Sequence, residues 1–331
     1  MAKSLERDCK YYYVYNMRMR NIMNMHNKGL IAAAVLGLAL SFSNVYSTPA
    51  IAAPAETSVS VNVHVQQEAT IDWTKGAESA ATATGLGFPP DNVGNRGHVL
   101  ARRAAIVDAY RLLAETIQGV QIDSDTTIES MVLQSDTVKA RVAALIKGAR
   151  IVDEGANEDG SYFVKVSVPL FGVGKSVANA VLPEATKNVV SQPAAKVDEK
   201  TTPLTKEEIK EVRSVTYTGV IVDASGMGLE PTFSPVIMDT NGRVIYGMQN
   251  IDKDMAISQG MVEYATDLQT ATGGTTRAGA NPLVISATTV NGGVNSVNPV
   301  NVVVSVEDGD KILLANEQAD MFGKCAVVFV K

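Results

Sequence analysis

Histidine and cysteine carry much of the nucleophilic and metal chemistry of proteins, and this chain has few of them. Downstream of residue 52 only His64, His98 and Cys325 remain. One cysteine and two histidines cannot supply a four-ligand Cys/His zinc site or a disulfide within the chain. A serine hydrolase that uses His64 or His98 stays open as an alternative, because triad residues need only be neighbours in space. No Gly-x-Ser-x-Gly turn supports it.

Two acidic segments that contain glycine could bind ions. Residues 223–228 (Asp-Ala-Ser-Gly-Met-Gly) suggest a phosphate loop, but they lack the Gly-Lys-Ser/Thr spacing and the third glycine of nucleotide-binding motifs. Residues 239–242 (Asp-Thr-Asn-Gly) resemble the start of a calcium loop without its later oxygen ligands. Both are better explained as tight turns that follow strands. The sequence therefore assigns no catalytic, cofactor-binding or metal-binding residue, and no cofactor.

One aromatic residue and a group of arginines are the remaining candidates for a binding surface. Trp73 is the only tryptophan, and its ring could stack on a flat ligand. Arg102, Arg103 and Arg111 would form a basic patch on one helix. A solvated helix face explains these arginines more simply than an anion site does.

The first 52 residues are expected to be a cleaved signal peptide. The uncharged apolar run at residues 29–42 is shorter than the ~20 residues that a membrane-spanning helix needs, so an anchor is the weaker alternative. Ala50-Ile51-Ala52 fits signal peptidase cleavage before Ala53. The stretch before the apolar run is unusually long for a signal peptide. The expected start of translation is therefore Met23 or Met25.

Removal of this segment would make an acidic chain more acidic. The full sequence has 29 basic and 35 acidic side chains, for a net charge of −6. Without residues 1–52 it has 23 basic and 33 acidic side chains, for a net charge of −10. Such a protein repels phosphate backbones, so no nucleic-acid partner is expected. No cysteine directly follows the apolar run, so no lipid anchor is evident. The predicted location is exported, either periplasmic or associated with the cell envelope.

Residues 53–182 are expected to form an α+β domain with helices packed on one face of a sheet. The predicted order is β-α-β-α-β-β, with a polar loop at residues 70–95 after the first strand. The first helix would bury the stripe Val99, Ile106, Tyr110, Leu113 and Ile117 and end at Gly119. The other predicted elements are strands at residues 57–65, 120–128, 150–154 and 162–168 and a helix from Ser135 to Gly148.

Residues 183–213 are rich in Ala, Lys, Glu, Thr and Pro, which predicts a flexible linker. Residues 214–331 would then form a second α+β module. Its Asn241-Gly242 pair predicts a hairpin between strands at residues 236–238 and 244–246. The other predicted elements are strands at residues 215–221, 283–285, 302–304 and 326–330 and helices at residues 257–268 and 310–319.

The alanine-rich helix and the segments after it resemble the Lpp-twenty-like lipoprotein domain of bacterial envelopes. The residues that carry the resemblance are Ala101–Ala105, Asp108–Arg111, Glu115, Gly119, Ser135-Asp136, Lys147–Ala149, Gly160 and Val166–Leu170. The same pattern is similar to the N-terminal domain of flagellar assembly protein T, a periplasmic component of a flagellar basal-body ring. Residues 217–224, 281–285 and 327–329 resemble the C-terminal module of longer members of the lipoprotein-like group.

The resemblance implies a dodecin-like α+β domain without enzymatic activity, and the missing lipobox cysteine means that lipid anchoring does not carry over. The expected function is that of an exported, non-enzymatic envelope protein that acts through protein–protein contacts. The assembly of a surface organelle such as the flagellar basal body is the specific role considered. Expected partners are envelope or flagellar proteins or further copies of this chain. A periplasmic protein that binds a small ligand is the alternative.

Overall fold

The computed structural model describes residues 65–91, 94–187, 195–292 and 297–331. All of these segments belong to one compact unit, Ser60–Lys331. The predicted signal peptide lies outside the described residues, as does the predicted strand at residues 57–65 except for its last residue. The described residues contain helices and four-stranded sheets in both halves, which confirms the α+β class.

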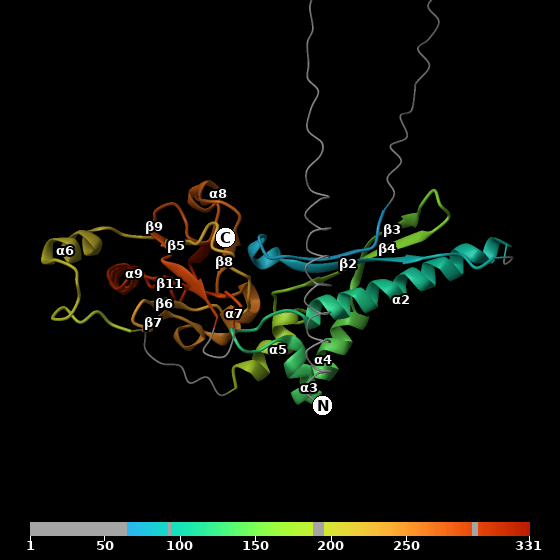
Figure 1. The fold of residues 1–331 in the computed structure, drawn as a ribbon, viewed down its shortest axis with the longest axis horizontal. Helices are drawn as coiled ribbons and strands as arrows, with labels where there is room; N and C mark the ends of the chain where they lie inside the picture. The colour runs from blue at the N-terminus through green and yellow to red at the C-terminus, as the bar shows by residue number, and fades with distance from the viewer. Residues whose placement is uncertain (1–64, 92–93, 188–194, 293–296) are drawn as a thin grey trace, which may run out of the picture. The chain divides into compact units, whose positions relative to one another are not determined.

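The first sheet is antiparallel, with the strand order β1-β2-β4-β3 (Figure 1). Its strands are β1 (Glu68–Asp72), β2 (Ala80–Gly87), β3 (Arg150–Ala156) and β4 (Tyr162–Pro169). The connection from β2 to β3 contains α2 (Gly97–Gln118), α3 (Ile128–Gln134) and α4 (Asp136–Lys147), and α5 (Val177–Ala185) follows β4.

Helix α2 lies unusually close to β2, because both elements present very small residues to each other. A Cβ atom at Gly85 would collide with backbone atoms of Ala105 and Ala109. A Cβ atom at Gly87 would likewise collide with the carbonyl oxygen of Ala101. The buried positions of α2 recur every four residues: Gly97, Ala101, Ala105, Ala109, Leu113 and Ile117. The small residues therefore set the distance between helix and sheet.

This alanine stripe corrects the predicted apolar face of α2. Leu113 and Ile117 are buried as predicted, but Val99 is exposed, and Ile106 and Tyr110 are only half-buried. Leucine-sized side chains would hold α2 away from β2, so the alanines face the sheet instead. Val99 is consequently left on the outer surface.

The predicted order β-α-β-α-β-β is also wrong, because the predicted polar loop at residues 70–95 contains most of β1 and all of β2. Strand β2 reads Ala-Ala-Thr-Ala-Thr-Gly-Leu-Gly and lacks the large apolar residues that usually mark a strand. The strand predicted at residues 120–128 is instead a turn that leads into α3. Thr127 begins that helix with a capping box, in which its hydroxyl accepts a hydrogen bond from the backbone nitrogen of Ser130.

The second half of the chain contains two further sheets. One is parallel, in the order β8-β12-β5-β9, and the other is mixed, in the order β10-β11-β6-β7. The parallel strands are β5 (Gly219–Asp223), β8 (Glu263–Ala265), β9 (Pro282–Ser286) and β12 (Val327–Val330). The mixed sheet has β6 (Ile237–Asp239), β7 (Val244–Tyr246), β10 (Thr289–Asn291) and β11 (Asn301–Val304). The hairpin predicted from Asn241-Gly242 joins β6 to β7, which confirms that prediction.

The helix predicted at residues 257–268 is divided into three elements. These are α7 (Lys253–Gln259), β8 and α8 (Leu268–Thr272). Gly260 ends α7 with a φ of +80°, a conformation that a helix cannot continue through. The helix predicted at residues 310–319 is present and begins earlier, as α9 (Val306–Ala319).

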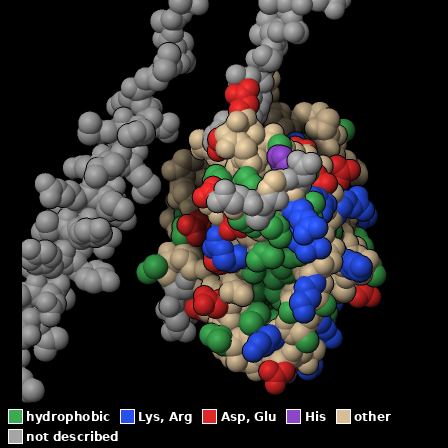
Figure 2. Space-filling model, turned by 90° about the vertical axis from the view of Figure 1, so that its right-hand side faces the viewer, with side chains coloured by type: hydrophobic (Ala, Val, Ile, Leu, Met, Phe, Trp, Pro, Cys, Tyr) green, Lys and Arg blue, Asp and Glu red, His purple; other side chains and the backbone are tan. Residues whose placement is uncertain are grey.

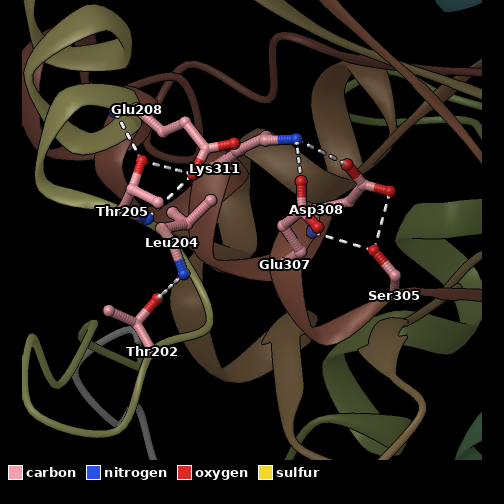
Figure 3. A network of polar contacts seen from close by, with 8 residues as sticks. All are labelled: Thr202, Leu204, Thr205, Glu208, Ser305, Glu307, Asp308 and Lys311. Atoms are coloured by element: carbon pink, nitrogen blue, oxygen red, sulfur yellow. Dashed lines mark hydrogen bonds and ion pairs between the residues drawn. The ribbon is translucent and has the colours of Figure 1, made fainter.

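The segment predicted as a flexible linker contains the helix α6 (Lys206–Ser214). Thr205 and Glu208 form its capping box, and Ile209 and Val212 are buried where α6 packs on α9. Figure 3 shows this capping box beside Lys311 of α9, which forms ion pairs with Glu307 and Asp308. Capping and two buried side chains are enough to order a short polar helix on a neighbour, which composition alone did not indicate.

Two tyrosines buried in the second half predict a loss of stability at alkaline pH. The Tyr246 hydroxyl donates to the carbonyl oxygen of Met261 at 2.7 Å, and that of Tyr264 donates to Thr232. Burial raises the pKa of both phenols above the ordinary value of 10.0. The folded state therefore keeps two protons that the unfolded chain loses near pH 10, and the free energy of unfolding should fall as pH rises further.

Urea unfolding at several alkaline pH values, followed with tyrosinate absorbance, measures this effect. Tyr264→Phe should make stability less dependent on pH. Tyr110→Phe, at a half-buried position on α2, is the control and should leave the dependence unchanged. Tyrosinate absorbance that develops fully before the fold is lost would contradict the prediction.

Candidate functional site

The residues that could carry nucleophilic or metal chemistry are not brought together. His98 is exposed at the start of α2, no described residue forms a hydrogen bond with its ring, and His64 lies outside the described residues. Cys325 is fully buried, and burial raises the pKa of its thiol, so the reactive thiolate is disfavoured. Among the described residues, no cluster of three or more His, Cys, Asp or Glu side chains could hold a metal ion.

Trp73 lies in the core and not on an open surface where its ring could stack on a ligand. Only 9% of its surface is exposed. Its ring centroid lies 5.1 Å from that of Phe233, 6.0 Å from that of Tyr264 and 6.2 Å from that of Phe171, all with edge-to-face geometry. Burial therefore argues against Trp73 as the stacking surface of a ligand site.

The two acidic loops are turns, as the sequence predicted. Ser225 donates from its backbone nitrogen to Asp223, and Gly226 and Gly228 both have positive φ. In the other loop, Asp239 is buried and accepts hydrogen bonds from the backbone nitrogens of Asn241 and Arg243. Each carboxylate thus stabilises its own turn.

Most of the predicted basic patch on α2 is neutralised by ion pairs. Arg102 pairs with Glu154 of β3 at 2.8 Å, and Arg111 pairs with Asp108 and Glu115 at 2.8 Å each. Arg103 is exposed and has no such partner among the described residues. The three arginines do not converge on one anion site, which agrees with the solvated-face interpretation.

An exposed apolar surface lies along the first part of α2. Val99, Leu100 and Val107 are exposed, the last at 67%, on the side of α2 away from its buried stripe. We call these three residues the α2 contact face. Figure 2 views the molecule from the side at which α2 begins in Figure 1, and hydrophobic side chains gather near its middle beside Lys and Arg side chains. Exposed apolar residues grouped in this way are typical of interaction surfaces.

A hollow that the sequence did not reveal lies where β4 leads into α5. Its volume is about 430 Å³, and Lys175, Arg150 and Glu78 supply its charged lining. An adjoining hollow of about 240 Å³ shares Leu145 and Lys175 with the first and adds Arg141. We call the two together the Lys175 hollow. The local signal was Gly172-Val-Gly-Lys-Ser176 between a strand and a helix, a sequence related to phosphate loops that lacks their first glycine.

Comparison with known families divides the chain into two matched parts. Residues 72–169 match the LPP20 lipoprotein family, and residues 219–331 match the second domain of Treponema pallidum Tp0624. No curated protein matches the chain. Residues 72–169, which we call the LPP20-like segment, are therefore similar to this family, which confirms the resemblance predicted from the α2 sequence. This match also indicates a place in the cell envelope. Within the described residues, no helix combines the length and apolar content needed to cross a bilayer.

Proposed function

We propose that the protein is an exported, non-enzymatic component of the cell envelope that acts through protein–protein contacts at the α2 contact face. The supporting observation is that Val99, Leu100 and Val107 remain exposed on the LPP20-like segment although the opposite side of α2 is fully packed. Keeping several apolar side chains in water is unfavourable unless another surface covers them.

The charges around this face indicate what kind of partner would fit. Arg96 and Arg103 are exposed near it, and neither has an ion pair among the described residues. A complementary surface would present an apolar helix or strand flanked by acidic side chains. We propose such a surface on another envelope protein as the occupant, and a second copy of this chain is the other outcome to be tested.

A photocrosslinking side chain placed at Val107 should capture the partner in cells. We expect a crosslinked product that contains one identified envelope protein and that disappears when Arg103 is replaced by glutamate. The same crosslinker at Leu133, which is 82% exposed on α3, is the matched control and should not give this product. Identical products from both positions, or none from either, would contradict the proposal. A product of this chain alone would identify a homo-oligomer instead.

The same experiment bears on the flagellar role, which rests on the similarity of the α2 segment to flagellar assembly protein T. Capture of a basal-body protein, together with loss of swimming in a deletion strain, would support that role. Capture of other envelope proteins, together with normal swimming of the deletion strain, would place the function elsewhere in the envelope. Binding of a small ligand is a second candidate function, and the Lys175 hollow is the observation that favours it.

A further inference from the structure

The Lys175 hollow combines open volume with positive charge in an acidic protein. It is formed by the end of α4, the start of β3, the end of β4 and the loop between β4 and α5. Its larger part, at about 430 Å³, falls within the volume range of small-molecule sites. The exposed end of the sheet and two helices thus leave a space that no side chain of the described residues fills.

Three cations from three different elements line this space. Arg141 comes from α4, Arg150 begins β3, and Lys175 precedes α5. None of the three has an ion pair or a hydrogen bond to a side chain among the described residues, and Glu78 is the one acidic residue in the lining. Several other cations of the fold do have such partners: Arg102, Arg111, Arg213, Arg243, Arg277 and Lys311 each contact a carboxylate. Three positive charges against one negative charge leave the lining net positive, which a bound anion would stabilise.

The backbone around Lys175 keeps the space open. Gly172 and Gly174 have φ values of +123° and +119°, which side chains rarely tolerate, and a Cβ atom at either position would meet open space. The Lys175 side chain extends over the end of α4, where its Nζ atom lies 3.9 Å from the position that a Cβ atom of Gly148 would take. Ser176 fixes the end of the loop, because its hydroxyl donates to the carbonyl oxygen of Gly172 and accepts from the backbone nitrogen of Asn179.

We infer that the Lys175 hollow is a binding site for a phosphate ester group. Two guanidinium groups and one ammonium group suit a tetrahedral oxyanion that carries between one and two negative charges, since guanidinium binds phosphate oxygens in pairs. The group can belong to a soluble phosphate ester or to the headgroup of an anionic phospholipid, both of which present the same oxygens. The hollow is separate from the α2 contact face, so the experiment on one can refute its proposal without refuting the other.

Binding is tested on the exported chain, residues 53–331, with three probes. These are inorganic phosphate and glycerol 3-phosphate by calorimetry, and vesicles of phosphatidylglycerol or phosphatidylcholine by co-sedimentation. The double variant Lys175→Gln, Arg150→Gln should weaken binding by about tenfold or more, because charge-assisted hydrogen bonds are lost. The control Lys139→Gln, Lys210→Gln removes the same charge at exposed positions outside the hollow and should bind as the unaltered protein does.

The outcomes separate the two sources of phosphate. Saturable binding of glycerol 3-phosphate that the hollow variant loses would assign the site to soluble esters. Binding to phosphatidylglycerol vesicles alone, again lost only in the hollow variant, would assign it to a lipid headgroup. No binding of any probe, or equal weakening in the hollow variant and the control, would overturn the inference. Thermal unfolding of both variants checks that the fold is intact.

Discussion

Replacing Gly85 with alanine should lower the free energy of unfolding by more than about 4 kcal/mol, which places it among the exceptional single substitutions. The added Cβ atom would lie 2.7 Å from the Cα atom of Ala109 and would collide with the backbone of Ala105. Backbone atoms in a helix cannot rotate away as a flexible side chain can. Helix α2 would have to lift from β2, and the stripe of alanines beneath it would lose its contacts.

Gly119→Ala is the matched control, because it adds the same methyl group to a glycine at the end of α2. Gly119 has a φ of −71°, and its added Cβ atom would approach no atom closer than 3.7 Å. This control should stabilise the protein by about 0.4–1 kcal/mol, since alanine restricts the unfolded chain at a compatible position. Urea unfolding followed by far-ultraviolet circular dichroism measures both. Equal stability of the two variants would show that α2 does not lie as close to the sheet as the structure has it.

The close packing of α2 also explains which parts of the fold could be predicted from the sequence. Local signals worked where a residue acts on its own neighbours: Ser135 caps α4, and Asn241-Gly242 forms a hairpin. Gly119 does end α2, but with a φ of −71° and not in the left-handed conformation that favours glycine. Strand β2 was not predicted because its small residues are required by its close contact with α2, which comes later in the chain. A strand that must consist of alanine, glycine and threonine to fit beneath a helix does not show the alternation of large apolar residues by which strands are predicted.

Both candidate surfaces were missed for a related reason. The α2 contact face appears only once the alanine stripe is known to face the sheet, which leaves Val99 and Leu100 outside. The Lys175 hollow has a local signal, the Gly172–Ser176 segment, but its two arginines come from α4 and β3. The antiparallel pairing of β3 with β4 places Arg150 beside the loop, and the packing of α4 on α5 places Arg141 there. Function in such a domain therefore depends on topology more than on any motif.

The aromatic cluster at Trp73 joins the two parts of the chain that match different families. Trp73 and Phe171 belong to or directly follow the LPP20-like segment, whereas Phe233 and Tyr264 belong to the segment that matches the Tp0624 second domain. Backbone hydrogen bonds support the same junction, since Ser234 donates to the carbonyl oxygen of Ile122 at 2.7 Å. The two segments therefore share one hydrophobic core, and they should unfold together.

Trp73→Ala should consequently lower the free energy of unfolding by about 3–5 kcal/mol, the usual cost of removing a large buried aromatic side chain. The effect should reach both segments, so that backbone amides of β4 and β12 lose protection from hydrogen exchange together. Phe88→Ala removes an exposed aromatic ring from the same domain and should change stability by less than about 0.5 kcal/mol. The prediction would be contradicted if the unaltered protein unfolded in two separate transitions and Trp73→Ala shifted only one of them. The LPP20-like segment would then be stable without its neighbour. The contact face and the Lys175 hollow would belong to an independent domain.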